Sequence, residues 1–484
     1  MEVHSLWTVR PDGLMSDAVF KQHMKTPLAL RSARSVPGSN KVVAIATGHH
    51  TFAYGSVVLI DPSQGLNTAE AIQVITPGVR LQEGAMVGTA PSQGGVRDEG
   101  GLYQSPFALS EDCFLVSYAY ARPDCSALGG VDSNGFAVYL IDVYGNRELI
   151  YRDRLMSCVS PIPLMRRPLP AQVPNLAADR SHGDAVCYVA DVYEGLEVIP
   201  RGTARYLRVA QHVGWPLDAD CGMAPYFADA AYQKQFAYWS WSPVRVIGTV
   251  PVSDDGSACF RVPADTAVYF QVLDDRFMEL RRMRSFVSLQ HGETRGCRGC
   301  HETQGKSPRT GWGSALALQR PPVGPAPPPW GSDRLLGYEW LIQPILDQHC
   351  VRCHGPHCAD GDIDLSGQRS EDGLLRSFRT MFGDRSNGQS SGKTLVSIAD
   401  RFSDSSVTKP KQFGSHRSPL VTVLLNDPLH QREVQLNDVE WYSLVTWIDC
   451  NAPYYDRFIN KRPADGGEPR RDVEPDPAGR LAER

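Results

Sequence analysis

Two copies of one short cysteine–histidine pattern stand out in this chain of 484 residues. They are CRGCH at 297–301 and CVRCH at 350–354, and chance would produce such a pattern only about 0.008 times from 12 Cys and 13 His. Two thiols three residues apart can join the two vinyl groups of one haem, and the adjacent His can then bind the iron as an axial ligand. The sequence therefore predicts two covalently bound haem c groups. The predicted cofactor-binding residues are Cys297, Cys300, His301, Cys350, Cys353 and His354.

The alternative chemistry for these motifs is zinc binding, because two Cys-x-x-Cys pairs can together make a tetrahedral zinc site. In a zinc ribbon the pairs lie about 15 to 20 residues apart and need no His after each pair. Here 49 residues (301–349) lie between Cys300 and Cys350. Haem is therefore the preferred prediction at both motifs, and a zinc-binding interaction protein without haem is the alternative.

A haem that only transfers electrons has both axial positions filled, as in His/His or His/Met ligation. His354 is the predicted first ligand of the second haem. Downstream of it the chain offers His430, His416 and Met381 as candidates for the sixth ligand. A surface role is the alternative for each histidine.

A further histidine feature is the adjacent pair His49 and His50, which follows a predicted strand at 42–46. Loops at strand ends carry functional residues and can cap a pocket of a neighbouring domain. Such a pair can supply a distal proton donor or a metal ligand at the first haem, so both are candidate catalytic residues. A structural role for the pair is the alternative.

The composition is that of a globular protein, with 42% hydrophobic and 21% charged residues. A net charge of -5 gives no reason to expect nucleic acid as a partner. No apolar run approaches the ~18 residues of a membrane-spanning helix, so no transmembrane segment is predicted. The 43 Gly and 36 Pro favour many turns and short strands. We expect a mainly β fold with a C-terminal α domain.

The first half of the chain is predicted to consist of short apolar strands, the clearest at 42–46, 56–60, 113–118 and 136–141. Three strands end in an aspartate, at Asp61, Asp142 and Asp191, in steps of 81 and 49 residues. These steps are near two blades and one blade of a β-propeller, at about 40 to 45 residues per blade. We therefore expect a partial β-propeller at 1–243, with a sandwich or a stack of hairpins as the alternative.

A small β domain carrying the first haem is predicted at 244–312, with Asp254-Asp255-Gly256 as a hairpin turn. The stretch RPPVGPAPPP at 320–329 favours a stiff extended linker at 313–331, because proline donates no backbone hydrogen bond. An α-helical cytochrome c-like domain follows at 332–460. The remainder, 461–484, has the composition of a disordered tail.

Two helices are predicted to enclose the second haem. Apolar residues recur at helical spacing from Tyr338 to Leu346, with a kink at Pro344, and this helix leads into the second motif. Asn437 followed by Glu440 has the spacing of a capping box before a final amphipathic helix.

Several short segments along the chain carry a resemblance to a known family. They are PGSNK at 37–41, TGHH at 47–50, SPIPL at 160–164, VPAD at 262–265, MRSF at 283–286, GCRGCHE at 296–302, PILDQHC at 344–350 and WID at 447–449. Together they resemble the family of the hydrazine synthase alpha subunit, whose relatives are planctomycete-type dihaem c-type cytochromes. The resemblance covers about residues 1–460 and is most specific around the two motifs.

The resemblance implies a propeller, a middle domain with a catalytic c-type haem, and a cytochrome domain whose haem relays electrons. It favours His430 as the sixth ligand, because relatives often carry His before the final helix. It also raises Cys158 as a thiolate for a zinc ion held with His301, against the plain alternative of an inert buried cysteine. In the synthase a Tyr four residues after the motif His binds iron, and this chain has Gly305 there. That departure puts hydrazine formation in doubt.

Covalent haem attachment implies a periplasmic or other extracytoplasmic compartment. The opening residues, MEVHSLW at 1–7, lack the basic and apolar regions of a signal peptide, so we expect an incomplete N-terminus. The leading prediction is a dihaem c-type cytochrome, either a redox enzyme acting on a small nitrogenous or other small molecule, or an electron-transfer subunit with a redox partner or companion subunits. The rival is a non-catalytic propeller scaffold with six-coordinate haems.

Overall fold

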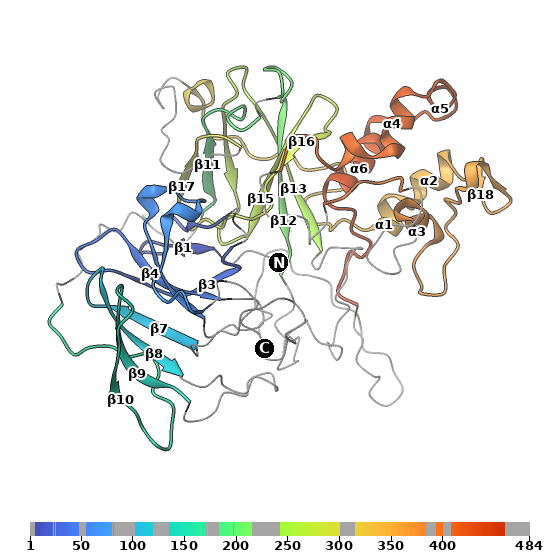
Figure 1. The fold of residues 1–484 in the computed structure, drawn as a ribbon. Helices are drawn as coiled ribbons and strands as arrows, with labels where there is room; N and C mark the ends of the chain where they lie inside the picture. The colour runs from blue at the N-terminus through green and yellow to red at the C-terminus, as the bar shows by residue number, and fades with distance from the viewer. Residues whose placement is uncertain are drawn as a thin grey trace, which may run out of the picture. The chain divides into compact units, whose positions relative to one another are not determined.

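The chain forms two compact units, one of Met1–Pro174 with Phe402–Val407 and one of Asn175–Arg401 with Thr408–Arg484 (Figure 1). Each unit is described by itself. The structure, a computed structural model, describes residues 5–22, 24, 26–47, 55–79, 81, 102–119, 135–167, 169, 172, 183–196, 198–214, 243–300, 315–383, 394–399 and 408–459.

The first unit contains two four-stranded antiparallel sheets in which each strand pairs with the next along the chain. A short hairpin of β1 and β2 precedes them. The strands are β1 (Leu6–Thr8), β2 (Asp17–Phe20), β3 (Ala29–Ser35), β4 (Val42–Thr47), β5 (Ser56–Ile60), β6 (Ile72–Val74), β7 (Leu102–Ala108), β8 (Cys113–Ala119), β9 (Ala137–Asp142) and β10 (Arg147–Tyr151).

Apolar side chains from both sheets share one core in this unit. Val43 and Val57 of the first sheet lie in the same buried cluster as Phe114 and Val116 of the second. Such runs of Val, Ile and aromatic residues form strands because branched and flat side chains pack well on a pleated surface. The mainly β prediction is confirmed for this part of the chain.

Two of the repeated aspartates occupy the same place in consecutive sheets. The number of sheets between them differs from the prediction. Asp61 directly follows the third strand of the first sheet, and Asp142 ends the third strand of the second. The 81-residue step in the described chain therefore separates consecutive sheets rather than spanning two blades. Propellers and sandwiches both contain such four-stranded meanders, so the partial β-propeller stays a prediction.

The second unit has a β part made of a three-stranded and a four-stranded sheet. The first has the order β14-β11-β17 and the second β13-β12-β15-β16. Only the β11–β17 pair is parallel. The strands are β11 (Ala185–Val189), β12 (Tyr206–His212), β13 (Val244–Pro251), β14 (Ala258–Val262), β15 (Val268–Leu273), β16 (Glu279–Arg282) and β17 (Thr294–Cys297).

The pairing of these strands differs from the sequence prediction in two ways. Strands β11 and β12 precede residue 244, yet they pair with β13, β14, β15 and β17 and so belong to the second unit, not to the propeller expected at 1–243. The turn at Asp254-Asp255-Gly256 is present, but β13 and β14 on either side join different sheets. The turn thus crosses between sheets instead of closing a hairpin.

The proline-rich stretch is not a free linker. Thr249 and Ala326 exchange both backbone hydrogen bonds, at 2.9 and 2.8 Å, and Arg261 N–H donates to the Val323 carbonyl at 2.9 Å. Val323 and Ala326 stand between prolines and keep the N–H group that proline lacks. The stretch therefore runs along an edge of each sheet, which corrects the expectation that 313–331 serves only as an extended linker.

The C-terminal part of the second unit is helical (orange to red in Figure 1). Buried residues of the sheets, Ala210 and Tyr269 among them, share one core with Tyr338 and Trp447 of the helices. Its elements are α1 (Tyr338–Leu341), α2 (Gln343–His349), β18 (His354–Gly355), β19 (Cys358–Ala359), α3 (Arg376–Phe382), α4 (Pro419–Asn426), α5 (Pro428–Glu433) and α6 (Asp438–Asp449).

Two local predictions for this part are confirmed. The helix before the second motif is interrupted at Ile342, two residues before Pro344. Asn437 accepts a hydrogen bond from the Glu440 N–H at 3.0 Å, and Glu440 accepts one from the Asn437 N–H at 2.9 Å, which completes the capping box of α6. None of the helices in the described ranges has the length and apolar composition needed to cross a membrane.

Candidate functional site

The second motif continues the helical turn at the end of α2. Cys353 N–H and His354 N–H both donate to the Cys350 carbonyl, at 3.1 and 2.9 Å. Cys350 N–H in turn donates to Leu346, in the last turn of α2. The two thiols and the His therefore come from one turn of backbone, which is the local arrangement that attachment to a single haem requires.

His430 of α5 lies beside His354. The ring centres are 6.2 Å apart and the ring planes are within 9° of parallel. Two imidazoles on opposite sides of one metal ion, each with a metal–nitrogen bond of about 2 Å, have ring centres about 6 Å apart. The separation of these two rings fits a shared metal ion between them.

Both rings are oriented by an acceptor at Nδ1. His354 Nδ1 lies 3.0 Å from the Asp360 carbonyl oxygen, and His430 Nδ1 lies 2.7 Å from the Asp427 carboxylate. Because carbonyl and carboxylate oxygens only accept, each Nδ1 donates the hydrogen bond, and Nε2 is the nitrogen left to face a metal. Histidines that bind metal through Nε2 show this same arrangement.

One ion pair and one histidine–carboxylate contact connect the surrounding helices. Arg352, inside the motif, contacts Glu433 of α5 at 3.1 Å. His349 at the end of α2 contacts Glu440 of α6 at 3.1 Å. The contact from Arg352 links the helix that carries His430 directly to the loop that carries Cys350 and Cys353.

The other two candidates for the sixth ligand have different surroundings. His416 contacts the Asp274 carboxylate at 3.0 Å. Met381 is fully buried, and its sulfur accepts a hydrogen bond from the Tyr338 hydroxyl at 4.0 Å. His430 is the candidate whose ring lies beside that of His354.

Burial raises the pKa of the Cys350 thiol to about 11, because apolar surroundings disfavour the charged thiolate. A zinc ligand must be a thiolate, whereas a thioether bond to haem carries no charge. Within the described ranges, no three His, Cys, Asp or Glu side chains are grouped so that they could hold a metal ion. The two adjacent thiols and the paired imidazoles at the second motif are donors that fit one covalently bound haem.

The first motif begins at the end of β17 and is held against the turn that follows β11. Ala190 N–H donates to the Cys297 carbonyl at 2.9 Å, and Cys300 N–H donates to the Glu194 carbonyl at 3.0 Å. Gly299 is required by this contact, since a Cβ there would lie 2.3 Å from the Glu194 oxygen. Both thiols thereby lie against the core of the two sheets.

Several predicted site residues cannot be placed. His301, His49 and His50 lie outside the described residues, as does the tail at 461–484. Cys158 is described and half-buried in the first unit, where its N–H donates to the Phe136 carbonyl at 2.8 Å. Its predicted link to His301 stays a prediction.

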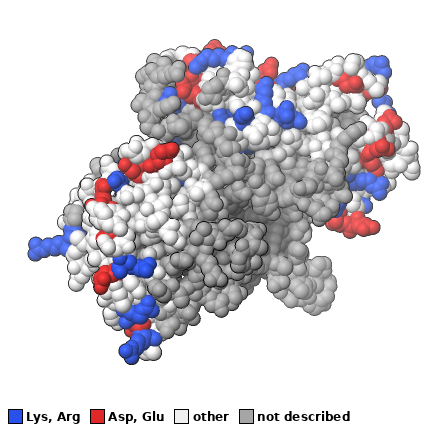
Figure 2. All heavy atoms as spheres, viewed as in Figure 1, with Lys and Arg blue, Asp and Glu red and all other residues white. Residues whose placement is uncertain are grey.

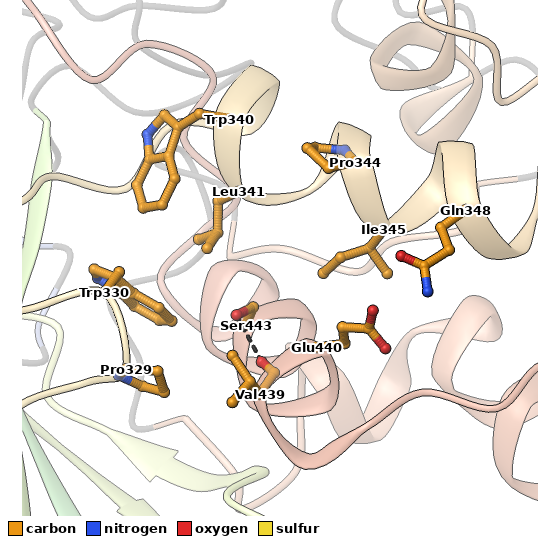
Figure 3. A pocket seen from close by; sticks show the side chains of 10 residues that line it. All are labelled: Pro329, Trp330, Trp340, Leu341, Pro344, Ile345, Gln348, Val439, Glu440 and Ser443. Atoms are coloured by element: carbon orange, nitrogen blue, oxygen red, sulfur yellow. Dashed lines mark hydrogen bonds between the residues drawn. The ribbon is translucent and has the colours of Figure 1, made fainter.

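A pocket of about 300 Å³ lies between α1, α2 and α6, and sequence reasoning did not find it (Figure 3). Trp330, Trp340 and Ile345 make much of its wall, and Glu440 of the α6 capping box lies at the side near α2. The mostly apolar walls come from three separate segments. A pattern within one helix could not have revealed them.

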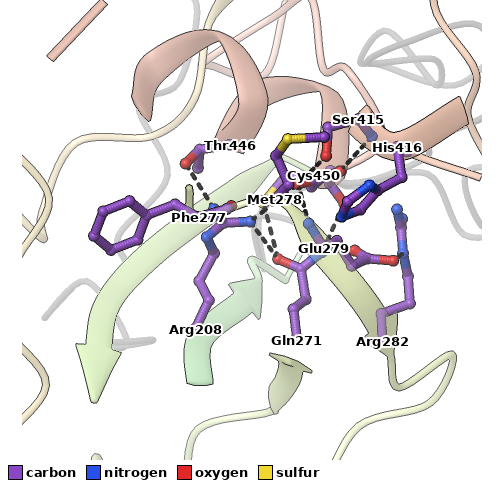
Figure 4. Close-up of polar contacts among 12 residues, drawn as sticks. Arg208, Gln271, Phe277, Met278, Glu279, Arg282, Ser415, His416, Thr446 and Cys450 are labelled. Atoms are coloured by element: carbon purple, nitrogen blue, oxygen red, sulfur yellow. Dashed lines mark hydrogen bonds and ion pairs between the residues drawn. The ribbon is translucent and has the colours of Figure 1, made fainter. Parts of the chain in front are cut away.

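A buried polar network joins the four-stranded sheet to α6 (Figure 4). Arg208 is fully buried and donates to Gln271 at 3.0 Å and to the Thr446 hydroxyl at 2.8 Å, and its guanidinium lies 3.9 Å from Asp449. Arg282 donates to Glu279 at 2.7 Å. Buried charges are tolerated when they are paired in this way.

Burial raises the pKa of Glu279 to about 7, with Arg282 partly opposing the shift. Between pH 4.5, the ordinary pKa of a glutamate, and pH 7, the folded chain therefore keeps the Glu279 proton that the unfolded chain has lost. Stability from this group is present at low pH and is lost as pH rises through about 7, by at most about 3 kcal/mol. Denaturant unfolding at pH 5, 6, 7 and 8 should show a flatter pH dependence for Glu279→Gln than for the parent.

The matched control is Glu371→Gln, which changes an exposed glutamate of the same unit. Its pH dependence should follow that of the parent. If Glu279→Gln and Glu371→Gln gave the same curve, the assignment of this titration to Glu279 would be wrong.

Charges of both signs are interspersed on the described surface seen in Figure 2. Among the described residues of that face neither sign of charge occurs alone, in keeping with the small net charge of -5. Binding of nucleic acid through its phosphates would need a basic stripe or patch.

Comparison with known proteins finds one family model that matches a region of the second unit. Residues 202–302, which span β12 to β17 and the first motif, match the model of the hydrazine synthase alpha subunit middle domain. The resemblance to the hydrazine synthase alpha subunit family is confirmed. The solved structure of Kuenenia stuttgartiensis hydrazine synthase has a similar fold, with a TM-score of 0.66 and 17% sequence identity over 93% of this chain. The present chain spans 65% of the length of that structure's chain. No curated protein matched the sequence.

Proposed function

We propose that this hydrazine synthase alpha-like chain is a dihaem c-type cytochrome whose second haem relays electrons. The observation that carries the proposal is the parallel pair of imidazoles, His354 and His430, 6.2 Å apart beside the thiols of Cys350 and Cys353. A haem bound there would supply one-electron exchange at its iron. His354 and His430 would hold this haem through its iron.

The residues around this pair would fix the geometry that electron transfer needs. The Asp360 carbonyl and the Asp427 carboxylate hold the two Nδ1 protons, so each ring presents Nε2. The ion pair between Arg352 and Glu433 connects α5 to the second motif. A ligand set that is the same in both oxidation states needs little rearrangement when an electron arrives or leaves.

The first haem is proposed at Cys297 and Cys300, with His301 as iron or zinc ligand and with Cys158, His49 and His50 as candidates around it. It is the candidate catalytic centre, and its substrate class is a small nitrogenous or other small molecule. Gly305 in place of the Tyr of the family argues for a reaction other than hydrazine formation. A redox partner or companion subunits in an extracytoplasmic compartment complete the proposal.

The test of the relay removes the proposed sixth ligand. In a Cys297→Ala/Cys300→Ala background, which keeps only the second motif, the reduced protein should not bind carbon monoxide. Adding His430→Ala should open the iron and give near-stoichiometric carbon monoxide binding, with a change from a low-spin to a high-spin spectrum. Absorption spectroscopy measures both.

The control is His416→Ala, which removes a histidine in contact with Asp274 and should leave the spectrum unchanged. If the His430→Ala protein did not bind carbon monoxide, the proposed ligation by His354 and His430 would be wrong. In the protein with both haems, carbon monoxide binding at the first haem would favour a catalytic centre. Its absence there would favour the scaffold alternative with two six-coordinate haems.

A further inference from the structure

Helix α5, which carries His430, has almost no packing of its own. It spans only Pro428–Glu433, and none of its six residues is buried. A short exposed helix is not held in place by a core, since most helical stability in proteins comes from a packed face. The protein contact that orients the His430 ring is a polar one at the start of the helix.

Asp427 makes the closest of these contacts. Its Oδ2 accepts the backbone N–H of His430 at 3.0 Å and the ring Nδ1–H of the same residue at 2.7 Å. One carboxylate oxygen thus caps the helix and orients the imidazole together. At the other end, Glu433 pairs with Arg352 but does not contact the ring.

The two rings differ in the charge of their acceptors. His354 donates to a neutral backbone carbonyl, whereas His430 donates to a carboxylate. A charged acceptor strengthens the hydrogen bond and makes the imidazole a stronger electron donor to a bound metal. A stronger donor favours the more positively charged, oxidised metal.

We infer that Asp427 is a positioning residue that holds His430 over the second haem and lowers the reduction potential of that haem. The inference rests on the proposed axial role of His430. It assigns a role to Asp427, a residue that lies outside both Cys-x-x-Cys-His motifs.

The test compares Asp427→Asn and Asp427→Ala with the parent by potentiometric titration and carbon monoxide binding. Asp427→Asn keeps a helix cap but removes the charge, so the preference for the oxidised state should fall tenfold to a hundredfold, which raises the potential by about 59 to 118 mV for one electron. Its spectrum should stay low-spin. Asp427→Ala also loses the ring contact, and a fraction of the protein should bind carbon monoxide.

Asp438→Asn is the matched control, because it changes an exposed carboxylate in the first turn of the neighbouring helix α6. The titration is run on the Cys297→Ala/Cys300→Ala protein and on the intact dihaem protein, where only the step of the second haem should move. If that background did not fold, the intact protein would still give the answer.

The inference about Asp427 is wrong if Asp427→Asn and Asp438→Asn have equal reduction potentials and Asp427→Ala does not bind carbon monoxide. In that case the proposed ligation by His430 still stands, as long as His430→Ala binds carbon monoxide. If His430→Ala left the iron closed, the axial assignment would fail and the inference would fail with it. The two failures are thus distinguished by one additional variant.

Discussion

Replacing Cys350 and Cys353 together with alanine is expected to reduce the covalently bound haem from two groups to one. Each thioether bond needs its own thiol, and these two come from a single turn in which Cys353 and His354 donate to the Cys350 carbonyl. The change removes both bonds and leaves the other motif, on β17, untouched. A haem count on denatured, pyridine-treated protein made with c-type maturation machinery measures the result.

The reciprocal Cys297→Ala/Cys300→Ala variant should also retain one haem, and the two losses together should remove both. Cys358→Ala is the control, because this exposed cysteine follows the second motif without belonging to it. It should keep two haems. A parent protein that carries zinc and no haem would reject the dihaem proposal and favour the metal-binding alternative.

Arg208→Ala is expected to lower the free energy of unfolding by about 3 to 5 kcal/mol. The fully buried guanidinium donates to Gln271 and Thr446 and lies 3.9 Å from the equally buried Asp449. Its removal takes a positive charge away from the Asp449 carboxylate, which is buried where water cannot compensate for the loss. Denaturant unfolding followed by circular dichroism measures the loss, and Arg208→Lys, which keeps the charge but not the planar group, should fall in between.

The control for this prediction is Arg205→Ala, one residue before β12, where the side chain is exposed. Its effect should stay within about 0.5 kcal/mol. A similar small loss for Arg208→Ala would show that the network contributes little to joining the sheet and α6.

Local features of the chain were predictable because their causes are local. The strands expected at 42–46, 56–60 and 113–118 correspond to β4, β5 and β8 within one residue, since runs of branched and aromatic residues favour extended backbone. The capping box at Asn437 and Glu440 formed for the same reason, as both of its hydrogen bonds lie within one turn.

Long-range features were not predictable from such patterns. The composition of the proline-rich stretch predicts a linker, whereas in the structure Val323 and Ala326 hydrogen-bond to the edges of two sheets. Strand β12 looks like one more short strand of the first half, but its partners β13 and β15 lie more than thirty residues further along the chain. Periodicity reports which face of a strand is buried and says nothing about which strand lies beside it.

The sequence by itself determined the chemistry that two Cys-x-x-Cys-His motifs can perform, because both thiols and the His of each motif lie within five consecutive residues. It left three candidates for the sixth ligand of the second haem, among which the family resemblance favours His430. Only the tertiary structure shows the His430 ring 6.2 Å from that of His354, next to the cap at Asp427 and the Arg352–Glu433 pair. A contact across more than seventy residues depends on how the intervening helices pack, and that packing is a property of the whole core rather than of any one segment.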